Sequence, residues 1–471
     1  MTFKSSNIFR IFLLFNVWMI VWEKVAFAYL DLVTGSFILQ FIFGGIAALV
    51  TSVKLNWDKI RPYITKKETA KTNLRQKKEI NPDKKQSFIS NWSHMDDFLS
   101  LPPSHREIVF YSEGSNDWVH FYPVIKHLTQ TYQCIICYLS SSPDDPGLHT
   151  NSPNIFQFLI GKGIIRTYIF KNIQARVFIM TMPDLGTFYL KRSVHPVHYV
   201  YLFHNMVSSH MTFKPGAFDH FDTIFCVGPH HIDEIRKTEN LNGLPKKQLF
   251  KHGYGRLDSI LKELNNHHHH PSNKGKPKIL IAPSWGKHGL LETKGEELVE
   301  ILLNAGFNVV VRPHPETTKH SPKVINSIQK RFSNHSNFVY EGSITSLSSL
   351  FQSDIMISDW SGVALEYAFG LEKPVLFIDV PRKVNNPNYT KIDIVPIEDF
   401  IRHEIGLILP PEQIKDIPLL IKTLLKNAPD FKSNICNLRN KWVYNIGDSG
   451  VRGAEKLVEL AKTSTAKKVK K

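Results

Sequence analysis

Four short runs of residues that can bind phosphate or move a proton each follow an apolar stretch of the sequence. They contain His204, Ser284, the pair Arg312 and His314, and the segment 358–362. Arginine offers donors in a fixed fork, and hydroxyls with the free N–H groups of a helix start can complete a cradle for a diphosphate. An imidazole near its ordinary pKa can take a proton from an attacking hydroxyl. Together these residue types predict a site that handles phosphate esters.

The last of these runs predicts a turn between a strand at 354–357 and a helix that begins at 363. Ser358, Asp359, Ser361 and Gly362 form the turn, and Glu366 follows Gly362 by about one helical turn. Such a turn suits a phosphate, and Glu366 could meet sugar hydroxyls in the same crevice. The alternative is an ordinary N-cap, because Ser and Asp satisfy the free N–H groups of many helices.

The elements that must position these residues alternate between short apolar runs and helical stretches from residue 106 onward, which predicts an α/β fold with two Rossmann-like, doubly wound domains. Strands are expected at 108–111, 134–139, 166–170, 176–180, 198–203, 223–227, around 249, and at 278–282, 307–311, 337–340, 354–357 and 374–379. Helices are expected at about 117–130, 295–304, 347–352, 363–370, 411–427 and 450–462. In such a fold the loops that follow the strands share one crevice, where a ligand binds.

Composition divides the chain into six parts. They are a membrane hairpin (1–53), a basic linker (54–105), an N-terminal Rossmann-like acceptor domain (106–264), a linker (265–276), a C-terminal nucleotide-binding domain (277–462) and a basic tail (463–471). The second linker contains four consecutive histidines flanked by Asn, Pro, Ser and Gly, which is typical of an interdomain connection.

The N-terminal region predicts two membrane-spanning helices. Residues 11–30 are apolar apart from Glu23 and Lys24, and 32–53 is uncharged and long enough to cross a bilayer. Basic residues precede the first segment and follow the second, so both flanks are expected on the cytoplasmic side of a bacterial-type inner membrane, together with the catalytic domains. A single span or a re-entrant segment is the alternative, because Glu23 and Lys24 interrupt the first arm.

The formal net charge of +16 is concentrated outside the two domains. Residues 54–85 contain 11 Lys or Arg against 4 Asp or Glu, and five lysines lie between 462 and 471. No basic recognition helix stands out, so nucleic acid is not the expected partner, and the linker is expected to contact anionic lipid headgroups instead. The sequence has no Walker A loop and no carboxylate cluster typical of Mg²⁺ or Zn²⁺, so neither a metal nor another cofactor is expected.

At its loop motifs the chain resembles the CDP-glycerol glycerophosphotransferases of the teichoic-acid polymerase type. The resemblance covers roughly residues 200 to 462. Its motifs are Gly255-Arg256-Leu257-Asp258, Ala282-Pro283-Ser284-Trp285, Arg312-Pro313-His314-Pro315, Ser358-Asp359-Trp360-Ser361-Gly362 with Glu366, Lys373-Pro374-Val375 and Asn445-Ile446-Gly447-Asp448-Ser449-Gly450. The family's usual Trp-His-Gly-Thr stands here as Phe203-His204-Asn205-Met206, so the histidine is kept while the glycine and threonine are not.

The resemblance implies a GT-B fold and a transferase that moves glycerol phosphate, or a related polyol phosphate, from a CDP-activated donor to a membrane-linked glycan or polymer, with release of CMP. It implies that His204 is the base on the acceptor hydroxyl and that His314 meets the phosphate under attack. The expected substrate-binding residues are Ser284, Arg312, Ser358, Asp359, Ser361, Gly362 and Glu366.

Two other functions fit the same residues. One is a GT-B glycosyltransferase that uses a UDP- or GDP-sugar, since the same loops would hold any nucleoside diphosphate; a nucleotide-sugar epimerase shares this fold and fits less well. The other is a catalytically inactive, membrane-bound scaffold for envelope-polymer assembly, which the altered Asn205-Met206 keeps open.

Overall fold

The structure is a computed structural model that describes residues 94–187, 190–266, 275–342 and 346–466. These residues lie within one structural unit, Asp83–Lys471. The expected membrane hairpin (1–53) and most of the basic linker fall outside the described residues. Within the described ranges, no helix has the length and apolar character that a membrane span requires.

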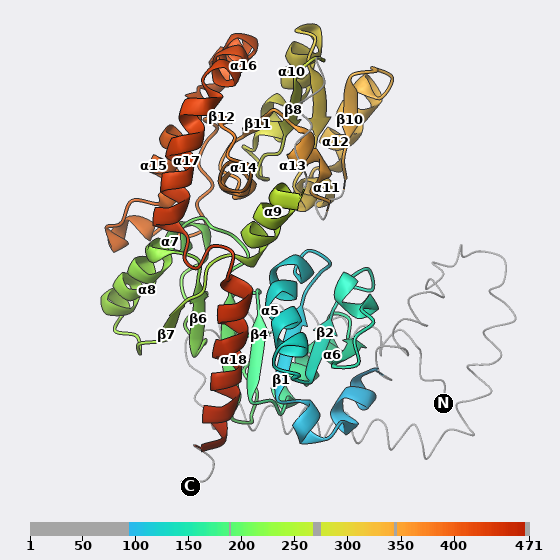
Figure 1. The fold of residues 1–471 in the computed structure, drawn as a ribbon, viewed down its shortest axis with the longest axis vertical. Helices are drawn as coiled ribbons and strands as arrows, with labels where there is room; N and C mark the ends of the chain where they lie inside the picture. Colours follow the sequence, from blue (N-terminus) through green and yellow to red (C-terminus); the bar gives the residue numbers. More distant parts are fainter. Residues whose placement is uncertain (1–93, 188–189, 267–274, 343–345, 467–471) are drawn as a thin grey trace, which may run out of the picture. The chain divides into compact units, whose positions relative to one another are not determined.

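Seven parallel strands of the described chain form the first sheet, in the order β3-β2-β1-β4-β5-β6-β7 (Figure 1). The strands are β1 (Ile108–Ser112), β2 (Ile136–Ser140), β3 (Ile155–Leu159), β4 (Val177–Met180), β5 (His198–Leu202), β6 (Thr223–Cys226) and β7 (Gln248–Lys251). The chain order reverses between β1 and β4. A ligand is expected beside that reversal, at the carboxyl ends of these strands.

The second sheet has the same winding, with six parallel strands among the described residues in the order β10-β9-β8-β11-β12-β13. The strands are β8 (Lys278–Ile281), β9 (Asn308–Val311), β10 (Phe338–Tyr340), β11 (Ile355–Ser358), β12 (Val375–Ile378) and β13 (Gly406–Leu409). Here the order reverses between β8 and β11. The expected pair of doubly wound α/β domains is therefore confirmed.

Helices connect the strands. The first domain contains α5 (Trp118–Gln130), α6 (Ile164–Asn172), α7 (Ser209–Thr212), α8 (Pro229–Asn242) and α9 (Gly255–Asn266), with the short 3₁₀ turns η1 (Pro103–His105) and η2 (Pro146–His149). The second contains α10 (Leu290–Asn304), α11 (Pro315–His320), α12 (Pro322–Phe332), α13 (Ser348–Gln352), α14 (Val363–Leu371), α15 (Ile397–Ile405), α16 (Ile417–Lys426) and α17 (Ala428–Trp442), with η3 (Tyr389–Ile392) and η4 (Pro411–Asp416). The chain then continues into α18 (Ser449–Ala466).

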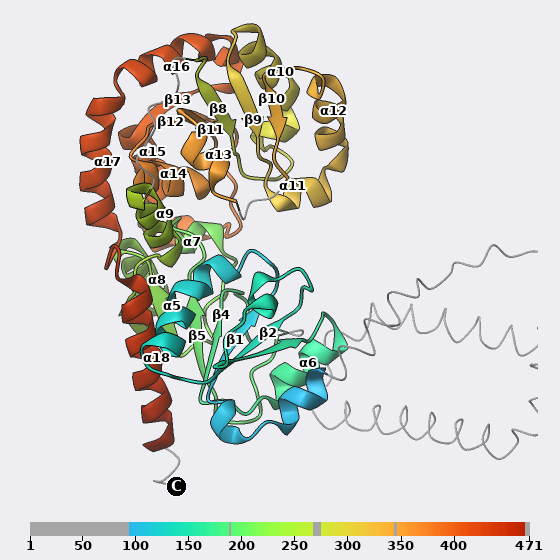
Figure 2. The same cartoon turned by 45° about the vertical axis from the view of Figure 1, so that its right-hand side comes forward.

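Alternate residues of each strand face two different cores, as the two-residue period of a strand requires. In β11, Ile355 and Ile357 join a core formed with α10, α12 and α16, whereas Met356 joins the core that contains α14 and α15 (Figure 2). Because both faces of the strands are buried under helices, the strands read as continuous apolar runs in the sequence.

The last helix, α18, packs against α5 on the first sheet (Figure 1). Its residues Ala454, Leu457 and Leu460 join the core made by Phe121 and Val124 of α5. The expected range 277–462 for the second domain therefore needs correction at its end, because the apolar face of α18 is buried against the first domain.

Two local expectations also differ from the structure. Residues 166–170 were expected as a strand but lie in α6, where Ile165 and Ile169 are buried one helical turn apart. The expected helix at 411–427 is a 3₁₀ turn followed by α16, and a further helix, α17, comes directly after it. The strands β3 and β13 were not anticipated.

Candidate active site

His204 lies just beyond the carboxyl end of β5, where the sequence placed the base. Its Nδ1 lies 3.4 Å from the hydroxyl of Tyr201, and its ring hydrogen-bonds to the main chain of Thr181, which follows β4. The Thr181 hydroxyl donates to Asp117 at 2.9 Å, in the loop after β1. Burial lowers the pKa of His204, while the Asp117 charge and the Thr181 bond oppose that shift. His204 is therefore a neutral, oriented imidazole at pH 7, as a general base must be.

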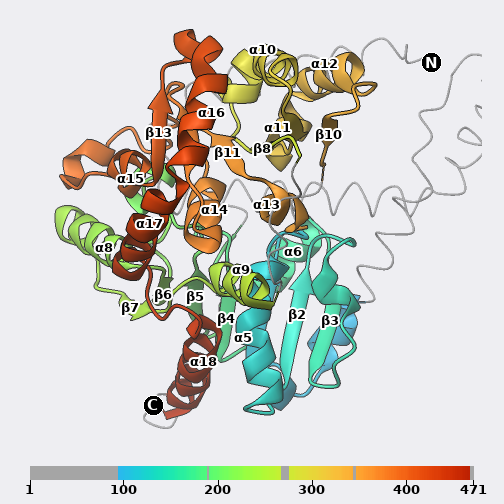
Figure 3. The ribbon, with the colours of Figure 1, turned by 45° about the horizontal axis from the view of Figure 1, so that its top comes forward.

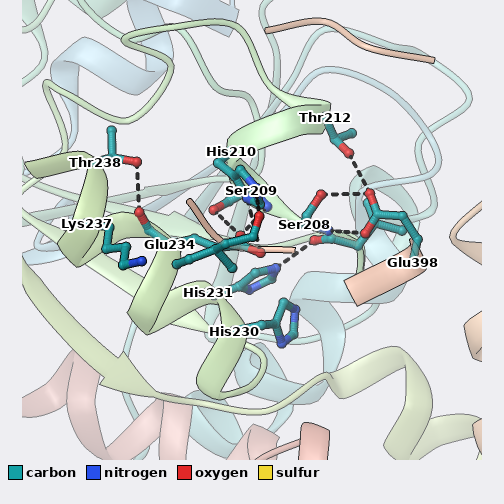
Figure 4. Close-up of polar contacts among 12 residues, drawn as sticks. Ser208, Ser209, His210, Thr212, His230, His231, Glu234, Lys237, Thr238 and Glu398 are labelled. Atoms are coloured by element: carbon teal, nitrogen blue, oxygen red, sulfur yellow. Dashed lines mark hydrogen bonds and ion pairs between the residues drawn. The ribbon is translucent and has the colours of Figure 1, made fainter. Parts of the chain in front are cut away.

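The segment that follows His204 is anchored by two buried carboxylates (Figure 4). Glu398 of α15 accepts hydrogen bonds from the Ser208 amide and hydroxyl at 2.9 and 2.7 Å. Glu234 of α8 accepts from the Ser209 amide and hydroxyl, both at 2.6 Å. Since α8 belongs to the first domain and α15 to the second, both domains fix the backbone that carries His204.

His210 closes this network. Its Nε2 bonds to the carbonyl of Ile394 at 3.0 Å, and its Nδ1 lies 3.2 Å from the Glu234 carboxylate, with both side chains fully buried. Burial lowers the pKa of His210, but the hydrogen bond and charge of Glu234 outweigh it, and the net shift is upward. The Glu234 carboxylate therefore favours the charged form of His210.

Three of the expected substrate-binding residues hold the loops of the second sheet together. The Asp359 carboxylate is fully buried and accepts from the Ser284 amide at 2.7 Å and from the Leu290 amide at 3.3 Å. Ser358 is also fully buried and donates to the carbonyl of Ala282 at 2.8 Å. These bonds join the loop after β8 to the turn after β11, so they shape that edge of the second sheet.

Ser361 and Gly362 lie at the N-terminus of α14 and are partly exposed. A Cβ atom on Gly362 would lie 3.7 Å from Cβ of Asn205 and 3.6 Å from Cγ1 of Val207. The structure therefore brings the free N–H groups of α14 against the segment that carries His204, which is the juxtaposition a phosphate site needs.

Glu366 is held by the first domain. Its carboxylate accepts from Nε of Arg256 at 2.6 Å and from the Tyr254 hydroxyl at 2.7 Å. The same hydroxyl lies 3.0 Å from the carbonyl of His204. Tyr254 directly precedes α9 and Arg256 lies in the first turn of α9, which packs against α14 (Figure 3). One ion pair and one tyrosine thus link the Glu366 carboxylate to the backbone of His204.

Arg312 and His314 follow β9. Arg312 is 3% exposed and donates to the Ser349 hydroxyl at 3.3 Å, and burial lowers its pKa. His314 caps α11, where its Nδ1 accepts from the Glu316 amide at 3.1 Å. Burial, followed by the positive charge of Lys383, lowers the pKa of His314 to about 4. His314 is therefore neutral at pH 7, and its Nε2 carries the proton; a protonated His314, which a charge-neutralising role would need, does not fit this environment.

Three residues without an expected role lie beside these groups. His120 of α5 and Tyr254 are near His204, and the ammonium of Lys383 lies 3.4 Å from the ring centroid of Trp285. Burial lowers the pKa of Lys383 to about 8. Only Tyr254 had a sequence signal, because it precedes a motif; the other two come from segments with no distinctive pattern. The described part of the chain contains no cluster of His, Cys, Asp or Glu suited to a metal ion.

Two Rossmann-like sheets with facing switch-point loops define the GT-B class. A UDP-GlcNAc 2-epimerase from Neisseria meningitidis bound to UDP-GlcNAc is similar, with 15% identity, 75% of this chain and 100% of that chain covered, and a TM-score of 0.52. The S. aureus MnaA–UDP structure matches at 12% identity, 77% and 97% coverage and a TM-score of 0.51. The wall teichoic acid polymerase TagF, solved as a histidine-to-asparagine variant with CDPG, matches at 14% identity, 81% and 96% coverage and a TM-score of 0.48.

The family model of CDP-glycerol:poly(glycerophosphate) glycerophosphotransferase matches residues 220–382. This match confirms the family resemblance drawn from the loop motifs and the expectation of a glycerophosphotransferase-like transferase. No curated protein sequence matches the chain. The matched region contains Arg312, His314 and the turn 358–362 but begins after His204.

Proposed function

We propose that this protein transfers glycerol phosphate, or a related polyol phosphate, from a CDP-activated donor to a membrane-linked saccharide or polymer in teichoic-acid-type envelope synthesis. The observation that carries the proposal is the position of the His204 segment beside the N-terminus of α14, where a Cβ added to Gly362 would lie 3.7 Å from Cβ of Asn205. A neutral base from one domain and an anion-binding helix start from the other thereby meet within one unit.

In the proposed reaction the acceptor hydroxyl attacks the phosphorus that carries the glycerol. His204 takes the hydroxyl proton while the new O–P bond forms, and the bond from that phosphorus to the oxygen of CMP breaks, so CMP leaves with the bonding electron pair. Negative charge on the transferred phosphoryl group needs donors in place beforehand. Arg312, the N–H of neutral His314 and the free N–H groups at Ser361 and Gly362 supply them.

The departure at Asn205-Met206 bears on the acceptor. Met206 is buried in the core of the first domain, while Asn205 is partly exposed beside Gly362. The side-chain oxygen of Asn205 is buried without a hydrogen-bond partner among the described residues. An amide in place of a glycine narrows the space beside His204, so we expect an acceptor different from that of relatives with glycine here.

We also propose that the protein is held at the membrane. A basic segment at 54–105 next to an apolar hairpin at 1–53 would keep the active site near a lipid-borne acceptor and would contact anionic headgroups on the cytoplasmic side. Nucleic acid is not part of the proposal. With the hairpin (1–53) removed, loss of binding to anionic vesicles when residues 54–85 are also deleted would test the headgroup contact separately.

A donor screen tests the reaction class. Full-length protein in detergent is heated with CDP-glycerol, CDP-ribitol, CMP, UDP-sugars or GDP-sugars, and the change in unfolding temperature is compared with that of Arg312→Ala and of the surface variant Arg331→Ala. Ligands that bind only the native state raise its stability by mass action. A shift with CDP-polyols or CMP that Arg312→Ala loses and Arg331→Ala keeps supports the proposal.

Two other outcomes of the donor screen would favour a different function. A shift with a UDP- or GDP-sugar alone would favour a glycosyltransferase. No shift with any nucleotide in a folded protein would favour the inactive scaffold. Release of CMP on addition of acceptor then separates transfer from simple donor binding.

A further inference from the structure

His120 is a buried histidine with an unsatisfied ring nitrogen next to the proposed base. It is the third residue of α5 and is 8% exposed. Its Nδ1 is buried and has no hydrogen-bond partner within the described ranges. Leaving a buried polar atom unpaired costs stability, and such an atom in a folded protein calls for an explanation.

Other buried histidines of this domain are bonded to the main chain. His230 bonds to the carbonyl of Met206 at 3.0 Å, and His252 to that of Gly253 at 3.1 Å. His231 uses both ring nitrogens, toward Val227 and Val207. The contacts of His230 and His231 fasten α8 to neighbouring loops. His120 makes no comparable contact, so its polar ring is not accounted for by the packing of the domain.

The position of His120 points to the substrate. Its ring centroid lies 6.2 Å from that of His204 and 5.6 Å from that of Tyr254. It comes from the first turn of α5, directly after the loop that follows β1, and β1 borders the point where the first sheet reverses its strand order. His120 therefore lies at the same carboxyl-terminal edge of the sheet as His204. The proposed reaction brings the acceptor hydroxyl to this edge.

The charge state of His120 indicates which kind of substrate group its ring can bind. Burial lowers its pKa well below the ordinary value, and the positive charge of Arg256 and the neighbouring His204 lower it further. A neutral imidazole has one donor and one acceptor and carries no charge for a phosphate. A hydroxyl group, which both donates and accepts, matches it better than a phosphate oxygen does.

We propose that His120 is a further substrate-binding residue, which hydrogen-bonds to an acceptor hydroxyl adjacent to the one that His204 deprotonates. The inference rests on the proposed transfer to a hydroxyl-bearing acceptor and makes that acceptor more specific: it carries neighbouring hydroxyls, as a polyol end or a saccharide does. His204 acts on one oxygen, and His120 holds the next.

The test uses full-length protein in detergent, with CDP-glycerol as donor and a short poly(glycerophosphate) with free terminal hydroxyls as acceptor probe. We compare His120→Ala, which removes the ring, with His120→Gln, which keeps a donor and an acceptor. His127→Gln is the matched control, because His127 lies two turns further along α5, is partly exposed and does not contact His204. Unfolding temperature is recorded for every variant.

We expect His120→Ala to raise the KM for the acceptor about tenfold, the size of one lost hydrogen bond to a buried partner, with the KM for CDP-glycerol unchanged. His120→Gln should recover part of the loss, and His127→Gln should match the wild type. An acceptor KM that is unchanged in His120→Ala, or a donor KM that rises by the same factor, would overturn the inference.

Calorimetric titration of the acceptor probe without donor separates this inference from the proposed function. If the wild type releases no CMP, the proposed transfer fails, yet weaker acceptor binding by His120→Leu than by His120→Gln would still support His120 as a binding residue. Equal binding by these two variants, or no binding by the wild type, counts against it. Leu and Gln are similar in size and differ in hydrogen bonding, so the comparison does not depend on the alanine variant folding.

Discussion

Removal of one partner from the Arg256–Glu366 pair should destabilise the protein far more than removal of a surface charge. The two side chains are only 9% and 10% exposed, and the Arg256 Nε lies 2.6 Å from the Glu366 carboxylate. Glu366 also accepts from the Tyr254 hydroxyl at 2.7 Å. Changing Glu366 to Gln removes the charge while keeping the length of the side chain, and it leaves the guanidinium buried.

The size of the effect follows from burial and distance. At an effective dielectric constant of about 20, unit charges at this separation attract each other by about 6 kcal/mol, most of which offsets the cost of taking both groups out of water. Breaking one side of such a buried pair costs about 3 to 5 kcal/mol, because the remaining charge stays buried. We expect the free energy of unfolding to fall by about 3 kcal/mol for Glu366→Gln, since Gln keeps one acceptor for Tyr254.

The assay is equilibrium urea unfolding followed by tryptophan fluorescence. The control is Glu296→Gln, the same change at a surface carboxylate 3.2 Å from Arg331, where the side chains are 39% and 45% exposed and the loss should stay below about 1 kcal/mol. The double variant Arg256→Met/Glu366→Met should recover most of the stability, because apolar side chains fill the volume without a buried charge. Equal losses for Glu366→Gln and Glu296→Gln would refute the reasoning, since they would mean that the pair is hydrated.

Three further predictions concern single residues. His204→Ala should lower the rate of CMP release about 10²- to 10⁴-fold while CMP binding is kept, and an unchanged rate would remove the catalytic role of this residue. Because the pKa of His210 is raised, the ion pair with Glu234 stabilises the fold fully below about pH 6.5 and its contribution is lost as the pH rises through the raised value. The stability difference between wild type and His210→Gln, measured from pH 6 to 9, should therefore shrink with rising pH, and a constant difference would contradict the pairing. Gly253→Ala should destabilise by more than about 1 kcal/mol in thermal unfolding, because Gly253 has φ +98° and a Cβ there would lie 2.3 Å from the carbonyl oxygen of Tyr444; a neutral result would contradict this geometry.

The strands that carry the site could be predicted from the sequence because they are buried on both faces. The runs at β1, β5, β8 and β11 are continuous apolar segments bounded by polar loops, and periodicity locates such runs. The same reasoning wrongly predicted a strand at 166–170, which lies in α6. Its apolar residues are too few to separate a strand from one face of a helix, and only packing on the sheet decides between them.

The loops of the site could be located from motifs, but the direction of each side chain could not. Ser358 and Asp359 have the residue types of a phosphate site, yet their atoms bond to the main chain of the neighbouring loop. A hydroxyl or carboxylate that binds a ligand and one that fastens a loop look alike in a sequence. Glu366 shows the same limit, since its partners Tyr254 and Arg256 lie more than a hundred residues away and come close only after both sheets are folded.

The return of α18 to the first sheet has a consequence for synthesis of the protein on the ribosome. The core of the first domain includes Leu457 and Leu460, and Asp258 accepts from the amides of Gly447 and Ser449 at the start of that helix, at 2.7 and 3.0 Å. The first sheet therefore emerges some two hundred residues before the helix that covers it. Until residues 449–466 have been translated, the apolar surface of α5 that α18 covers stays exposed, and exposed apolar surface on an incompletely folded chain promotes aggregation.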